Sequence, residues 1–217
     1  MLKDKRSWYN PFHYIAGSKA LLYGLLAILL ASLIGNFSGI HFPGVIDAKV
    51  GWEGNFAGHL SMALIAWLSM TVVTFLTARI MSPTKLRFID MAGTQALARV
   101  PSIFLALLGF FGVLRKVTDA ILFRTLEQLE QVMEIEIEPI TDPGPVATWE
   151  YILAALILLI TILLIIWMVA LMYHAFRVCS NLKGSRAGFS FVMAILIAQV
   201  VSNACIYFLA RSGVLQF

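Results

Sequence analysis

The stretch YILAALILLITILLIIWMVALMY, residues 151–173, decides the fold class of this protein. It contains no charged residue, and its 23 positions exceed the roughly 20 residues that a helix needs to cross a hydrocarbon core about 30 Å thick. A single run of this kind could also be the buried helix of a soluble protein. The rest of the chain therefore has to distinguish the two cases.

The composition of the 217-residue chain excludes a soluble domain, because 60% of its residues are hydrophobic and only 13% are charged, with a mean hydropathy of +0.86. Soluble domains carry about 25% charged residues. Two cysteines, 15 glycines and seven prolines exclude a disulfide scaffold and a collagen-like chain. The length suits one domain, so we expect residues 1–217 to form a single membrane domain.

Four further apolar runs are long enough to span a bilayer and are bounded by charged or turn residues. The five predicted spans cover about 20–39, 56–78, 94–114, 151–173 and 188–209. Five buried helices in so short a chain would need a polar shell that this composition does not supply. The sequence therefore predicts an all-α, polytopic membrane protein, a bundle of five transmembrane helices.

Lysine and arginine residues divide unequally between the two sides that these spans define, eleven against five. Short, positively charged loops stay in the cytoplasm, which predicts a cytoplasmic N-terminus and an outside C-terminus. Two acidic residues lie inside and ten outside, so the faces carry about +9 and −5, and the net charge of +4 is their sum. The basic residues lack an aromatic platform, so we expect membrane lipids and no nucleic acid as partners.

The longest polar segment, 115–150, is predicted to lie outside. Its first half places Leu122, Leu126, Leu129 and Met133 on one helical stripe, which predicts a short amphipathic helix lying on the membrane or on the bundle. The alternating glutamates of 134–138 favour an extended, solvated acidic segment. They lack the glycine-centred turn of a calcium loop, so we expect no metal site there.

Few polar residues are predicted at membrane depth, and no Asp or Glu lies near the middle of a span. This weighs against a proton- or sodium-coupled carrier. The uncharged exceptions are Asn36, His59, Gln95, Gln199 and Asn203. Gln199 and Asn203 lie four residues apart on one helix face, a pattern typical of hydrogen bonds between helices. The histidines lack metal-ligand spacing and no catalytic motif occurs, so we expect no catalytic residue, cofactor or metal.

The third span contains the residues that fit a membrane helix least well. Because 101–114 is too short to cross, the span is expected to begin near Thr94, which places Arg99 about one turn inside the membrane. Arg99 then either extends to the headgroups or pairs with Asp90. Pro101 lies within the helix and predicts a kink or a break near the interface.

Several segments resemble a known family. They are Asn10-Pro11-Phe12, the stretch 88–94 running into Ala98-Arg99-Val100-Pro101, Trp167 with 173–177, and 184–187. On these features the chain resembles the bacterial branch of the Yip family, the Ypt- and Rab-interacting membrane proteins. The resemblance implies a five-helix bundle. In eukaryotic members it implies roles in vesicle traffic through contact with small GTPases and with other family members.

These observations predict a protein without enzymatic activity in the cytoplasmic membrane of a bacterium. We expect it to act as a scaffold or accessory subunit through protein or lipid association, with a membrane protein or a second copy as partner. The alternative is a small transporter or channel component for an amphipathic or lipidic solute, which a broken third span and His59 would allow.

Overall fold

The computed structural model describes residues 11–51, 54–82, 85–133, 142 and 144–212. The predicted acidic segment 134–138 lies outside these residues. Helices make up nearly all of the described chain, in the order η2 (Pro11–His13), α1 (Gly17–Ser38), α2 (Phe56–Met81), α3 (Phe88–Leu97), α4 (Pro101–Leu108), η3 (Gly109–Phe111), α5 (Val113–Met133), α6 (Thr148–Ser180) and α7 (Gly184–Arg211). Two short strands, β1 (Ile40–His41) and β2 (Lys49–Val50), lie between α1 and α2. The predicted all-α class is confirmed.

Five helical segments are long and apolar enough to cross a membrane, which confirms the predicted number of spans. They are Gly17–Ser38, Phe56–Met81, Phe88–Phe111, Thr148–Ser180 and Gly184–Arg211. Most extend past the predicted bounds, which stopped near the first charged residue. Arg79 and Arg177 lie in the last turns of α2 and α6, where a cation interacts favourably with the helix dipole.

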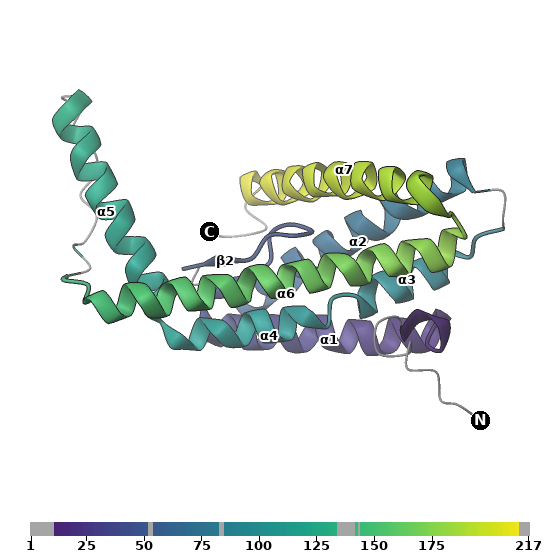
Figure 1. The fold of residues 1–217 in the computed structure, drawn as a ribbon, viewed down its shortest axis with the longest axis horizontal. Coiled ribbons are helices and arrows are strands. Elements are labelled where there is room, and N and C mark those ends of the chain that lie inside the picture. Colours follow the sequence, from purple (N-terminus) through teal and green to yellow (C-terminus); the bar gives the residue numbers. More distant parts are fainter. Residues whose placement is uncertain (1–10, 52–53, 83–84, 134–141, 143, 213–217) are drawn as a thin grey trace.

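The spans form an elongated bundle along one axis (Figure 1). The starts of α1, α3 and α7 meet the ends of α2 and α6 at one end, which we call the basic end because Lys85, Arg87 and Lys183 lie in its loops. The opposite end, from which α5 leaves, is called the α5 end. At this end Gly112 adopts a positive φ of 62°, a conformation that glycine accepts at little cost. This turn directs α5 away from the third span.

Close packing between α1 and the third span holds the basic half of the bundle together. A Cβ atom at Gly24 would collide with the backbone of Ala96 and Leu97, and one at Gly93 would collide with the backbone of Gly17. Small residues allow helices to approach this closely inside a membrane, where dispersion contacts drive much of the association.

The connection from α1 to α2 folds back into the bundle as a hairpin, whose strand β2 is seen between α6 and α7 in Figure 1. Gly51 N donates to Gly39 O at 3.1 Å and closes the hairpin, and β1 pairs with β2 in the register Ile40 with Val50 and His41 with Lys49. Its tip is buried in the largest hydrophobic cluster, where Val45 is fully inaccessible beside residues such as Met70, Ala98, Met168 and Ala198.

The hairpin therefore enters from the α5 end and returns to it without crossing. Its partner residues show its depth, because Ala98 follows the end of α3 in the middle of the third span. Non-helical backbone is tolerated at membrane depth only where protein or water covers it. Here the surrounding helices cover most of it, since residues 41–45 are all buried.

Candidate functional site

A polar contact between the hairpin tip and α7 is the most unusual feature at membrane depth. Gln199 is residue 16 of the 28 in α7. Its Nε2 donates to Asp47 Oδ2 at 2.6 Å, and its Oε1 accepts from Ile46 N at 3.2 Å. Close by, Ser202 Oγ donates to the carbonyl oxygen of Pro43 at 3.3 Å. The side chains of Gln199 and Ser202 thus provide hydrogen bonds to backbone and side-chain groups of the hairpin tip, which has no regular secondary structure to provide them.

The polar groups continue outward from this contact. Asn203 lies one turn beyond Gln199, with its Oδ1 3.5 Å from Gln199 Nε2. Asn203 is exposed, and Asp47 and Gln199 are half-buried. We call Asp47, Gln199 and Asn203 the polar strip. It brings the two amides predicted to share a face together, and it opens toward the side of the bundle at mid-span.

No span carries Asp or Glu near its middle, but Asp47 is a carboxylate that reaches mid-span depth from outside the spans. The span boundaries placed Asp47 in an outer loop, but the hairpin carries it to the depth of Gln199. A signal was present in the sequence, because Ile40, Phe42, Val45 and Ile46 make the loop around Pro43 and Gly44 too apolar for an exposed connection. A Cβ atom at Gly44 would collide with the side-chain amide of Gln199, so a larger residue there would displace this amide from its contacts with the tip.

His59 lies near the start of α2 and is buried. Its ring meets that of His41 edge to face, with centroids 6.3 Å apart. His41 lies in the hairpin, outside the five spans, and its pKa is lowered to about 4 by burial, with smaller effects of the neighbouring His59 and Lys49 charges. The two rings therefore pack together at the open end of the hairpin, where β1 meets the start of α2, and not at the tip that carries the polar strip.

The structure corrects the predicted position of Arg99. The third span begins at Phe88, six residues before the expected Thr94, so Arg99 is residue 12 of 24 and lies in mid-span. Burial of Arg99, which is 3% exposed, excludes an extension to the headgroups. Asp90 lies about 13 Å from Arg99 along the helix axis. Its Oδ2 atom is instead 3.9 Å from Arg87 Nε. Neither predicted environment of Arg99 is present.

The predicted break at Pro101 is confirmed, but it lies in mid-span and not near the interface. Ala98–Val100 form a turn between α3 and α4, and Pro101 is the first residue of α4, where its missing N–H costs nothing. Arg99 Nε and Nη2 have no hydrogen-bond partner among the described residues, and one turn earlier the same is true of Gln95 Oε1. A buried cation and a buried acceptor thus lie on one face of the broken span.

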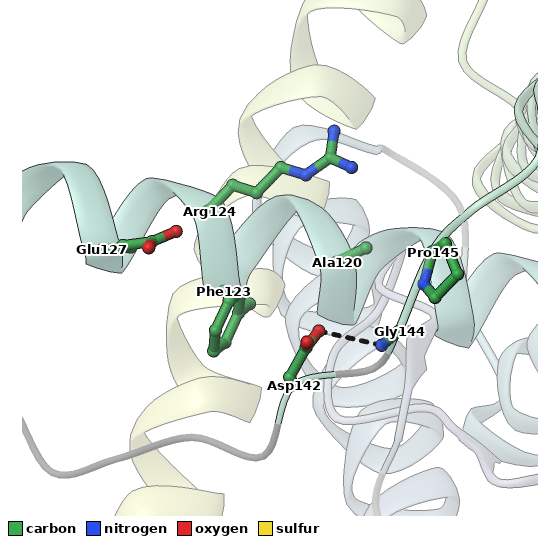
Figure 2. Close-up of a pocket in the computed structure, with 7 residues that line it drawn as sticks. All are labelled: Ala120, Phe123, Arg124, Glu127, Asp142, Gly144 and Pro145. Atoms are coloured by element: carbon green, nitrogen blue, oxygen red, sulfur yellow. Dashed lines mark hydrogen bonds between the residues drawn. The ribbon is translucent and has the colours of Figure 1, made fainter.

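A pocket of about 340 Å³ lies at the α5 end, between α5 and the segment before α6 (Figure 2). Arg124, Glu127 and Asp142 line it, and Asp142 Oδ1 accepts from Gly144 N at 2.9 Å. In Figure 2 the Arg124 side chain points away from Asp142. One cationic side chain and two carboxylates around an open hollow favour neither an anionic nor a cationic ligand.

Among the residues that the structure describes, no group of three His, Cys, Asp or Glu side chains could hold a metal ion. The chain matches no protein-family model, no curated protein and no solved structure in three separate comparisons. The polar strip and the broken third span are therefore the features on which a function has to be argued.

Proposed function

We propose that this multi-pass protein is a scaffold or accessory subunit without enzymatic activity, which associates with a second membrane protein through the polar strip. The observation that carries the proposal is the exposure of Asn203, with Asp47 and Gln199 half-buried beside it, at mid-span depth. Lipid tails offer no hydrogen bonds, so polar groups at this depth favour cover by another protein. A partner helix with polar side chains would pair with the strip.

The rest of the membrane-facing surface supports this reading by contrast. Exposed residues on α6 are almost all aliphatic, as Leu156, Leu159, Leu163 and Ile166 illustrate, and such a surface is stable in lipid. The exposed face of α7 also carries apolar residues, but Val200 lies directly beside the strip. The strip is thus a local exception on an otherwise lipid-like surface.

Photo-crosslinking in native membranes tests the association. A photoreactive amino acid replaces Val200, which is 69% exposed beside the strip, and a control replaces Leu163 on α6, which is 56% exposed. We expect a discrete protein adduct from position 200, absent from position 163 and reduced several-fold by Asn203→Leu. Equal adducts from both positions, or insensitivity to Asn203→Leu, would contradict the proposal. Two differently tagged copies would show whether the partner is a second chain.

The location and orientation are part of the same proposal. We place the protein in the cytoplasmic membrane of a bacterium, with the basic end in the cytoplasm, because basic residues outnumber acidic ones there. The resemblance to the bacterial branch of the Yip family agrees with this location and with association as the mode of action. Reporter fusions after Pro143 and Lys183 are expected to report opposite sides, and the Lys183 fusion is expected to report the cytoplasm.

A transporter or channel component for an amphipathic solute is the second candidate. The hairpin that enters the bundle and the mid-span break at Arg99 favour it, because both features occur where membrane proteins bind or conduct solutes. Purified protein in phosphatidylcholine vesicles would be assayed for movement of a fluorescent phospholipid between leaflets. Movement that is lost in Arg99→Met would favour this candidate over a scaffold.

A further inference from the structure

α5 is anchored to the bundle at its root. Val117 and Ala120 are buried there, and Lys116 Nζ donates to Glu150 Oε1 and Oε2 at 2.7 and 2.9 Å. Arg124 Nη1 lies 3.3 Å from the hydroxyl oxygen of Tyr151. The contacts join the first half of α5 to the start of α6, so the direction of α5 is set by the bundle.

That direction lies across the spans. Figure 1 shows α5 meeting the start of α6 at a steep angle and extending beyond the other helices. The five spans run along the long axis of the bundle, and spanning helices lie on average about 20° from the membrane normal. A helix that crosses this axis at one end of the bundle follows the plane of the membrane surface.

Aromatic side chains directly before α5 and at the start of α6, which contacts the first half of α5, indicate the level of this half of the helix. Phe110 and Phe111, directly before α5, are each 58% exposed, and Trp149, at the start of α6, is 60% exposed. Aromatic residues, Trp above all, are enriched where a membrane protein meets the headgroups. The root of α5 therefore lies at the boundary between acyl chains and headgroups.

The exposed surface of α5 has an apolar side and a charged side. Ile121, Leu122 and Leu129 are 55%, 47% and 40% exposed, and at 3.6 residues per turn they fall within about 100° of the helix circumference. Glu127 and Glu130 lie about 170° and 130° around the helix from the middle of this apolar side, and Glu127 faces the open hollow of Figure 2. The helix carries three basic and three acidic residues, so its attraction to a membrane does not depend on anionic lipid.

We propose that α5 lies on the membrane surface at the α5 end, with Ile121, Leu122 and Leu129 inserted beneath the headgroups and Glu127 and Glu130 in water. The occupant of the apolar side is thus the bilayer and not a protein. The contact extends the lipid-facing surface of the spans sideways from the bundle. It does not depend on the association proposed for the polar strip.

Depth-resolved fluorescence on the full chain tests this placement. Cys179 and Cys205 are replaced by alanine, and single cysteines at positions 121, 122 and 129, or at 127 and 130 as matched controls, carry an environment-sensitive fluorophore. The labelled proteins are reconstituted in phosphatidylcholine vesicles. Only variants with the size-exclusion elution and thermal unfolding of the wild type are compared. Because three apolar positions are labelled, the test still works if one of these variants does not fold.

We expect positions 121, 122 and 129 to show blue-shifted emission and at least two-fold stronger quenching by spin-labelled lipid than positions 127 and 130. Aqueous iodide is expected to quench with the reverse preference. Equal iodide quenching at all five positions would place α5 in water and overturn the proposal. Blue-shifted emission without lipid quenching would show that α5 packs on protein, and would overturn it as well. Vesicles containing phosphatidylglycerol should give the same pattern.

Discussion

Gln199 Nε2 lies 2.6 Å from Asp47 Oδ2, although the two residues are 152 positions apart in the chain. Together with the bond from Ile46 N to Gln199 Oε1, this contact gives one amide side chain two of the three side-chain hydrogen bonds described here between the hairpin and α7, the third being that of Ser202. The hydrocarbon core contains no water that could replace these hydrogen bonds, so we expect them to contribute to the free energy of unfolding.

We therefore expect Gln199→Leu to destabilise the protein. The substitution leaves Ile46 N and the Asp47 carboxylate without their partner, and an unsatisfied buried polar group costs about 1–3 kcal/mol. Thermal unfolding in detergent should show a clear fall in the midpoint. Asn203→Leu is the control, because Asn203 is exposed and makes only the 3.5 Å contact. A midpoint that falls equally in both variants would show that the hairpin contact is not the reason.

Close packing of α1 on α3 predicts a strong effect of a single methyl group at Gly24. Its Cβ would overlap the backbone of Ala96, so the helices must separate, at a typical cost of about 1–3 kcal/mol for overpacking. Gly188, in α7, is the control, because a Cβ atom there would meet no described atom within 4 Å. Thermal unfolding should show a lower midpoint for Gly24→Ala and an unchanged or slightly raised one for Gly188→Ala. A neutral Gly24→Ala would mean that this interface is looser than described.

Removal of the Arg99 charge should raise stability. Arg99 is a buried cation whose Nε and Nη2 have no hydrogen-bond partner in the described part of the chain, and replacing buried charge by an apolar side chain of similar size is often neutral or stabilising. Arg99→Met is expected to unfold at a higher temperature than the wild type, whereas Arg87→Met, at an exposed site 3.9 Å from Asp90, should change little. A large fall for Arg99→Met would indicate a bound anion that compensates the guanidinium, which would favour the transport candidate.

Burial of His41 predicts a pH dependence with a definite sign. With a pKa of about 4 in the folded protein against 6.5 ordinarily, His41 binds a proton in the unfolded chain but not in the folded one between these values. Stability should therefore fall as the pH is lowered from 6.5 toward 4. Comparison of unfolding midpoints across this window should give a shallower slope for His41→Gln than for the wild type. Parallel slopes would count against this assignment.

The spans could be predicted because membrane crossing imposes a length and a composition on each segment separately. The run at 151–173 shows this most clearly, and α5 was recognisable from the stripe of Leu122, Leu126 and Leu129. The bounds were too narrow because charged residues such as Arg177 continue a helix past the hydrocarbon. The break at Pro101 was also predictable, since proline lacks the N–H that a helix interior requires.

The sequence by itself determined the number of membrane spans, the all-α class and the charge difference between the two ends, because each depends on local composition. Only the tertiary structure decided that the loop after α1 enters the bundle, that Asp47 reaches Gln199 and that Arg99 lies in mid-span. These features depend on contacts between residues far apart in the chain. The free energy of such contacts cannot be predicted from local sequence patterns, so the contacts are found only in the packed structure.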